Sequence, residues 1–128
     1  GIATLTTSDK LMQAAQVRAD EMAASGAYSH TRPDGRKYTT VTDCKYVGEN
    51  IHRIADWALQ GKPVSEVAMW SWNHSAGHQN NLLDKSYAEI GVGLARGVNE
   101  DGYECWYCVQ LFLWNGYSVS WVDAPAAK

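Results

Sequence analysis

Hydrophobic residues in the first part of the chain recur at helical spacing. Between residues 8 and 25 they form one stripe: Leu11, Ala14, Ala15, Met22 and Ala23. This stripe predicts an amphipathic helix that is capped by Ser8 or Asp9 and ended by Gly26. The polar side of this helix then carries three charged residues: Arg18, Asp20 and Glu21.

The middle of the chain has a weaker pattern. Residues 36–48 have no clean period and predict a loop. A short helical turn is indicated farther on by the spacing of Ile51, Ile54 and Ala55. A second clear helix is predicted over about 63–73, after the break at Gly61 and Pro63. Its expected inward side chains are Val67, Met69 and Trp70.

The last third of the chain has the period of strands. Ile90, Val92 and Leu94 alternate with small residues, two of them glycines that would let another segment approach closely. Residues 97–102 predict a hairpin loop, 103–114 a central strand that is apolar on both faces, and 117–122 an edge strand. Helices followed by antiparallel strands indicate an α+β layered domain.

Composition narrows the classes of protein. The 128 residues are 45% hydrophobic and 20% charged, which is typical of one globular domain. The net charge of -3 argues against a nucleic-acid partner. No apolar stretch approaches the roughly 20 residues of a transmembrane segment. The start at Gly1 leaves open the removal of a signal peptide or upstream region from a longer precursor.

The three cysteines suggest one disulfide and one free thiol. Cys105 and Cys108 fall in a predicted strand, where residues three apart face opposite sides at about 10 Å, too far for a bridge. We therefore favour core cysteines with one bridge to Cys44 over a redox pair. A zinc knuckle would need a second pair of thiolates.

Polar residues capable of chemistry adjoin several predicted elements: His30, Glu49, Asn50, His74, His78 and Asn80. Glu49 with an imidazole could perform acid–base work or, with two imidazoles, bind a divalent metal such as zinc. His74 and His78 have the spacing of a helical metal site, but Ser75 and Gly77 interrupt a continuous helix. His52 and His74 are interpreted as ordinary hydrogen-bonded histidines.

Five segments in order carry a family resemblance. They are "LMQAAQVRADEMAASGAYSHTRPDGR" (11–36), "VGENI" (47–51), "AMWSWNHSAGHQNNLL" (68–83), "EIGVGLA" (89–95) and "YCVQLF" (107–112). Together they resemble the CAP superfamily, or SCP domain, of cysteine-rich secretory proteins, antigen 5 and pathogenesis-related proteins, and its bacterial branch most closely. The resemblance implies a three-layer α-β-α sandwich with a small antiparallel sheet. One CAP domain over 1–128 is expected, without room for the family's usual first helix.

The resemblance also implies a cleft with two histidines and two glutamates. By motif, His30, Glu49 and His78 match three of them, and we expect Asn50 and Asn80 to line the same cleft. Ser75 stands where the second glutamate would fall, and Glu66 is the nearby carboxylate that could substitute. The tentative metal ligands are His30, His78 and Glu49, for zinc or another divalent ion.

The family does not imply one reaction. We expect an exported binding or interaction module, secreted or at the cell surface, whose partner is a protein, a lipid or a cell-envelope ligand. One alternative is a metal-assisted hydrolase with Glu49 as general base. Another is a lipid or sterol carrier whose groove would be lined by some of the six tryptophans and seven tyrosines.

Overall fold

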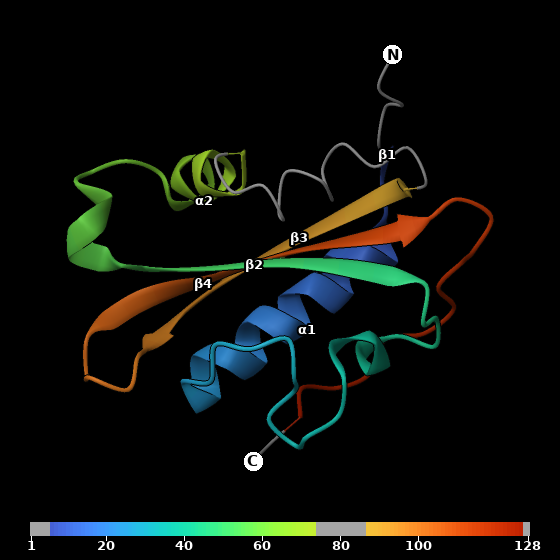
Figure 1. Cartoon of the computed structure of the whole chain (residues 1–128), viewed down its shortest axis with the longest axis horizontal. Helices are drawn as coiled ribbons and strands as arrows, with labels where there is room; N and C mark the ends of the chain where they lie inside the picture. The colour runs from blue at the N-terminus through green and yellow to red at the C-terminus, as the bar shows by residue number, and fades with distance from the viewer. Residues whose placement is uncertain (1–5, 74–86, 127–128) are drawn as a thin grey trace.

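The computed structural model describes residues 6–73 and 87–126, where two helices cover opposite faces of one sheet (Figure 1). The elements in chain order are β1 (Thr6–Thr7), α1 (Asp9–Ser25), the 3₁₀ turn η1 (Tyr38–Val41), β2 (Val47–Ala55), the 3₁₀ turn η2 (Asp56–Leu59), α2 (Val64–Asn73), β3 (Tyr87–Val98) and β4 (Glu104–Trp114). The predicted three-layer α-β-α sandwich is confirmed.

The sheet has the strand order β1-β3-β4-β2 within these ranges. Strand β4 pairs antiparallel with both β3 and β2, while the two residues of β1 add a short parallel pair to β3. The central position of β4 explains why its sequence is apolar on both faces. The central strand predicted over 103–114 is therefore confirmed.

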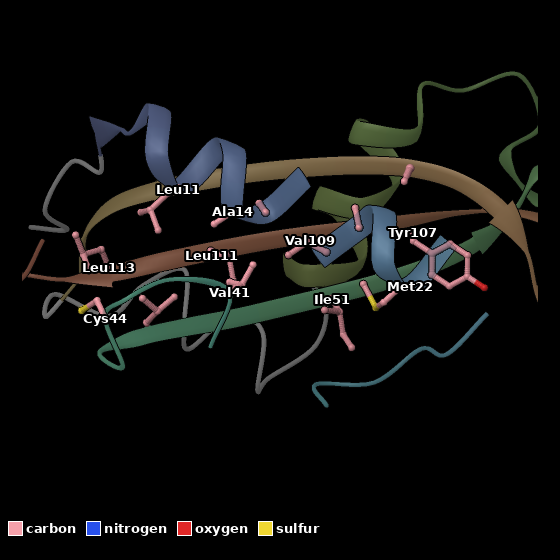
Figure 2. Packing of buried hydrophobic residues seen from close by; sticks show 14 of the residues in the cluster. Leu11, Ala14, Met22, Val41, Cys44, Ile51, Tyr107, Val109, Leu111 and Leu113 are labelled. Carbon is pink, nitrogen blue, oxygen red and sulfur yellow. The ribbon is translucent and has the colours of Figure 1, made fainter. Parts of the chain in front are cut away.

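Helix α1 packs along β3 and β4 and forms the larger core with them (Figure 2). The Ser8 hydroxyl accepts a hydrogen bond from the Leu11 amide at 3.3 Å, and Gly26 ends the helix with a left-handed φ of 73°. A Cβ added at Gly91 would lie 2.1 Å from the Leu11 backbone, and one at Gly93 would lie 2.4 Å from the Ala15 backbone. The predicted role of these glycines in a close approach is thus confirmed.

The polar side assigned to α1 is wrong at two positions. Arg18 and Glu21 are buried, with exposed fractions of 0% and 1%, whereas Asp20 is exposed. Charged residues can be buried when oppositely charged partners reach them. Arg18 and Glu21 pair with each other, and their further partners, Glu49 and Arg32, come from outside the helix.

Residues 47–55 form strand β2, so the helical turn predicted from Ile51, Ile54 and Ala55 is wrong. The strand lies at the edge of the sheet and buries polar residues, which hides its two-residue period. The predicted loop 36–48 also contains the 3₁₀ turn η1.

Helix α2 covers the opposite face of the sheet with a narrow stripe, Ala68 and Trp72, each 1% exposed. The prediction that Met69 and Trp70 face inward is wrong, because their exposed fractions are 39% and 61%. Val67 is half-buried. Two tryptophans stand two residues apart in α2, and only the second lies one helical turn from Ala68.

All three cysteines are free and buried, so the predicted disulfide is wrong. Cys105 belongs to the core under α1 and Cys108 to the core under α2, which confirms that they face opposite sides of β4. Residues 117–122 do not form the predicted edge strand, and only Val122 makes a bridge, to Thr42. No helix in the described ranges is long and apolar enough to cross a membrane.

Candidate functional site

His30 and Glu49 meet between the loop after α1 and strand β2. Nδ1 of His30 lies 2.7 Å from Oε1 of Glu49. The Glu49 side chain is fully buried, whereas the His30 side chain is 53% exposed. The structure therefore joins two of the predicted site residues into a carboxylate–imidazole pair with the imidazole facing solvent.

The loop that carries His30 is fixed by a tight turn. The Gly35 amide donates to the Arg32 carbonyl at 2.9 Å, and Gly35 has a φ of 93°, which suits glycine. The Tyr38 amide then donates to the His30 carbonyl at 3.0 Å. These bonds fold residues 30–38 back on themselves and hold the His30 backbone at the start of the turn.

Arg18 of α1 fixes the Glu49 carboxylate from behind. Its Nε donates to Oε2 at 2.7 Å and its Nη2 to Oε1 at 3.2 Å. This two-point geometry orients a carboxylate more firmly than a single bond. Burial would lower the pKa of Arg18, but its hydrogen bonds and charge interactions with Glu49 and Glu21 outweigh that effect and raise the pKa.

The pairing with Glu49 sets the chemistry of His30. An ionised carboxylate only accepts hydrogen bonds, so Nδ1 of His30 must carry the proton in the pair. In a neutral imidazole the lone pair is then on Nε2. The Tyr38 ring lies 5.8 Å from the His30 ring, and burial together with the Glu49 charge raises the pKa of Tyr38 to about 12. Nε2 can bind a cation or accept a proton.

Asn50 does not join this pair, because it points to the other face of the sheet. Its Nδ2 donates to Oε1 of Gln110 at 3.1 Å, and Gln110 in turn lies against Met69 of α2. His52 is on the same face, with Nε2 at 3.3 Å from the Ser71 hydroxyl, in keeping with its interpretation as a hydrogen-bonded histidine. Neighbouring residues of a strand face opposite sides, so Glu49 lies on the α1 side of the sheet and Asn50 on the α2 side.

The remaining candidates are placed only in part. His74, Ser75, His78 and Asn80 lie outside the described residues. Glu66 is exposed in the first turn of α2 and lines a surface hollow of about 290 Å³ with residues of η2 and α2, among them Trp70. That hollow is on the α2 side of the sheet, whereas His30 lies on the α1 side.

Of the predicted metal ligands in the described ranges, His30 offers one nitrogen that could ligate a metal ion. Nε2 of His30 is an imidazole nitrogen of the kind that zinc prefers, and Glu49 lies behind it as the carboxylate that orients such a ligand. Within the described ranges no group of three or more histidine, cysteine, aspartate or glutamate side chains could hold a metal ion. His78, the other predicted imidazole ligand, lies outside the described residues.

Sequence analysis missed Arg18, Glu21 and Arg32 as parts of the site. Arg18 and Glu21 have the three-residue spacing of a helical ion pair, which is also typical of exposed helix surfaces. Arg32 precedes a Pro-Asp-Gly turn and resembles a loop residue. Their burial depends on contacts between distant segments, which spacing does not reveal.

The cysteine-rich secretory protein (CAP) family model matches residues 1–112. This chain belongs to the CAP family. A curated relative, the uncharacterized protein YkwD of Bacillus subtilis (strain 168), is 26% identical over 98 residues. The match covers 73% of this chain and 35% of YkwD.

Two solved structures have a similar fold. An extracellular protein containing an SCP domain from Bacillus anthracis has a TM-score of 0.63 at 21% identity, over 89% of this chain and 35% of that chain. An outer surface protein from Borrelia burgdorferi has a TM-score of 0.54 at 19% identity, over 88% of this chain and 78% of that chain. At these identities the likeness shows the fold. This CAP chain spans about a third of the length of YkwD and of the Bacillus anthracis protein.

Proposed function

We propose that this CAP chain is an exported binding module whose centre is the His30 imidazole, oriented by Glu49 and able to take a divalent cation. His30 and His78 are the proposed ligands, and zinc is the proposed ion. A bound zinc would offer an open coordination position to a ligand from a protein or from the cell envelope. The extracellular and outer-surface proteins of similar fold support the proposed location outside the cell.

The observation that carries this proposal is the engagement of the Glu49 carboxylate. Both of its oxygens accept hydrogen bonds from Arg18, and one of them also contacts His30. This carboxylate is fully buried and both of its oxygens are already engaged by Arg18 and His30, so it is poorly placed to contact a water molecule directly. The same arrangement suits a carboxylate that orients a binding imidazole. Binding is therefore favoured over hydrolysis.

Titration calorimetry with zinc near neutral pH tests the proposal. We expect saturable binding that His30→Ala and His78→Ala each abolish or strongly weaken. Glu49→Gln should weaken binding by about 10–100-fold, as is usual when the partner of a ligating histidine is changed. His52→Ala is the matched control, since His52 is on the other face of the sheet, and it should bind like the parent. Absence of zinc binding in the parent would refute the metal site.

The hydrolase alternative uses the same residues and is separated by another measurement. It requires activity on a peptide, ester or phosphodiester substrate that disappears in Glu49→Gln. Activity that survives this substitution would exclude Glu49 as general base. The carrier alternative requires that an apolar ligand be recovered from the purified protein by solvent extraction, above the amount in a control sample.

A further inference from the structure

A chain of alternating charges is buried behind the Glu49 carboxylate. Arg18 contacts Glu49 on one side and Glu21 on the other, where its Nη1 lies 3.2 Å from Oε1 of Glu21. Glu21 also contacts Arg32, whose Nη2 lies 2.6 Å from Oε2. All four side chains are 0% exposed. Two guanidiniums and two carboxylates thus form a neutral buried quartet.

The far end of the quartet is closed by the C-terminal segment, residues 122–126. Nη1 of Arg32 donates to Oδ2 of Asp123 at 3.1 Å, and Nη2 donates to the Ala124 carbonyl at 3.1 Å. The Ala126 amide donates to Oε2 of Glu21 at 2.7 Å. Figure 1 shows this red segment running beside the loop that follows α1. The C-terminal segment therefore supplies partners to both members of the Glu21–Arg32 pair.

All three nitrogens of the Arg18 guanidinium donate hydrogen bonds. Besides Glu49 and Glu21, it contacts the loop before His30, because its Nη2 donates to the Ser29 carbonyl at 2.6 Å. A planar guanidinium with fixed partners on several sides has one orientation. The Glu49 carboxylate that accepts hydrogen bonds from Arg18 is then also fixed in one orientation. The same holds for the His30 imidazole that is hydrogen-bonded to Glu49.

Stability alone does not account for such a quartet. Removing four charges from water is costly, and apolar side chains of similar volume often give equal or greater stability. What the charged residues add is direction, since each hydrogen bond fixes an angle as well as a distance. Here the hydrogen bonds orient the Glu49 carboxylate, and through it they orient Nδ1 of His30.

We propose that Arg18 is a positioning residue for His30, and that Glu21 and Arg32 hold Arg18 in its working orientation. Through Glu49, these residues keep the proton of His30 on Nδ1 and leave Nε2 as the nitrogen that binds. The inference deepens the proposed function and rests on His30 being the binding group. It assigns roles to three buried charged residues that act on His30 through Glu49.

The tautomer of His30 gives a direct test. Long-range ¹H–¹⁵N correlation spectra of the metal-free protein, at a pH about two units above the ordinary imidazole pKa of about 6.5, distinguish a proton on Nδ1 from one on Nε2. The His30 signals are identified by their absence in His30→Ala. We expect the proton on Nδ1 in the parent and a shift toward Nε2 in Arg18→Lys, which keeps the charge but loses the planar fork. Arg32→Lys should cause a smaller shift in the same direction.

The control is Arg53→Lys, because Arg53 makes a comparable two-point contact with Glu100 at the surface. It should leave the His30 tautomer unchanged. A proton on Nε2 in the parent, or a folded Arg18→Lys with the parent's tautomer, would overturn the proposal. If Arg18→Lys does not fold, Glu21→Gln takes its place, with the same shift expected and the same overturning result.

The tautomer and the zinc titration can fail separately. A parent protein with the expected tautomer but no affinity for zinc would refute the proposed metal site and leave the positioning role intact. A parent that binds zinc, but whose His30 tautomer does not respond to Arg18→Lys or Glu21→Gln, would refute the positioning role and leave the proposed metal site intact.

Discussion

Cys108 shows how burial decides the chemistry of a single residue. It is fully buried between β4 and α2, where it packs in the cluster of Ala68 and Trp72. Burial, together with the nearby Cys105, raises the pKa of the Cys108 thiol from its ordinary 9.0 to about 12. Because the thiolate is the reactive form, we expect Cys108 to react slowly near neutral pH despite the apparent Cys-x-x-Cys motif.

We therefore predict slow alkylation of Cys108 in the folded protein. The raised pKa leaves far less of the Cys108 thiol as thiolate near neutral pH than an exposed cysteine has, and burial slows access further. Mass spectrometry of the iodoacetamide-treated protein checks this, since Cys108 should remain unmodified until denaturant is added. Cys44, which lines a surface hollow and is 8% exposed, is the internal comparison and should react earlier. Equal rates for the two thiols in the folded state would contradict the prediction.

At the scale of elements, the packing of α1 on the sheet depends on the glycines of β3. The Ala15 backbone lies so close that a Cβ at Gly93 would be 2.4 Å away, and backbone cannot yield as a flexible side chain can. Helix α1 also carries Arg18 and Glu21, so its distance from the sheet sets where the charged quartet lies.

Gly93→Ala should destabilise the protein by about 1–3 kcal/mol, as overpacking in a core usually does, because α1 must move outward. Urea denaturation followed by circular dichroism measures the change. Glu89→Ala introduces the same residue in the same strand at a half-buried position, and we expect it to lie within about 0.5 kcal/mol of the parent. Equal stability of the two variants would argue against the close contact as the reason for glycine at this position.

Elements with a strong period could be predicted from sequence, and those fixed by tertiary contacts could not. The α1 stripe and the apolar run of β4 each bury one consistent surface, so local spacing identified both. Strand β2 was not predicted because it buries polar residues on both of its faces, with Glu49 on one face and Asn50 on the other. Its sequence therefore lacks the alternation of apolar and polar residues that identifies a strand. In α2 the choice between Trp70 and Trp72 depends on where the sheet lies, which the helix alone does not encode.

For the whole molecule, the candidate site was predictable only as far as short motifs extend. The Gly-Glu-Asn and Ser-His motifs placed Glu49 and His30 in one candidate cleft, and the structure has Nδ1 of His30 at 2.7 Å from Oε1 of Glu49. The residues behind them are separated by long stretches of chain, as with Arg32 and Asp123, which are 91 positions apart. Only folding brings such charges together, so their roles could not be derived from spacing.

Similar long-range contacts make the docking of residues 120–126, which are the C-terminal segment together with Ser120 and Trp121, sensitive to acid. Asp43 accepts hydrogen bonds from the Ser120 and Trp121 amides, and Asp123 accepts them from Arg32 and Arg36. The Ser120 amide chiefly lowers the pKa of Asp43, and Arg32 chiefly lowers the pKa of Asp123, both from an ordinary value of 3.8. A carboxyl with a lowered pKa in the folded state stabilises that state above its ordinary pKa, and the contribution is lost as pH falls through the folded value.

We therefore predict that residues 120–126 detach in acid while the sheet remains folded, once the pH falls below the ordinary aspartate pKa of 3.8 and through the lowered pKa values of Asp43 and Asp123. Heteronuclear NOE values of the Ser120 and Ala124 amides should fall with pH before those of β4 change. Asp123→Ala should lower the Ala124 value already at neutral pH, whereas Asp101→Ala, a surface aspartate of the β3–β4 loop, should not. If the segment and β4 lose order together at every pH, the aspartates do not control the docking of the segment. The contacts of the Ala124 carbonyl and the Ala126 amide with Arg32 and Glu21 must then hold it in place.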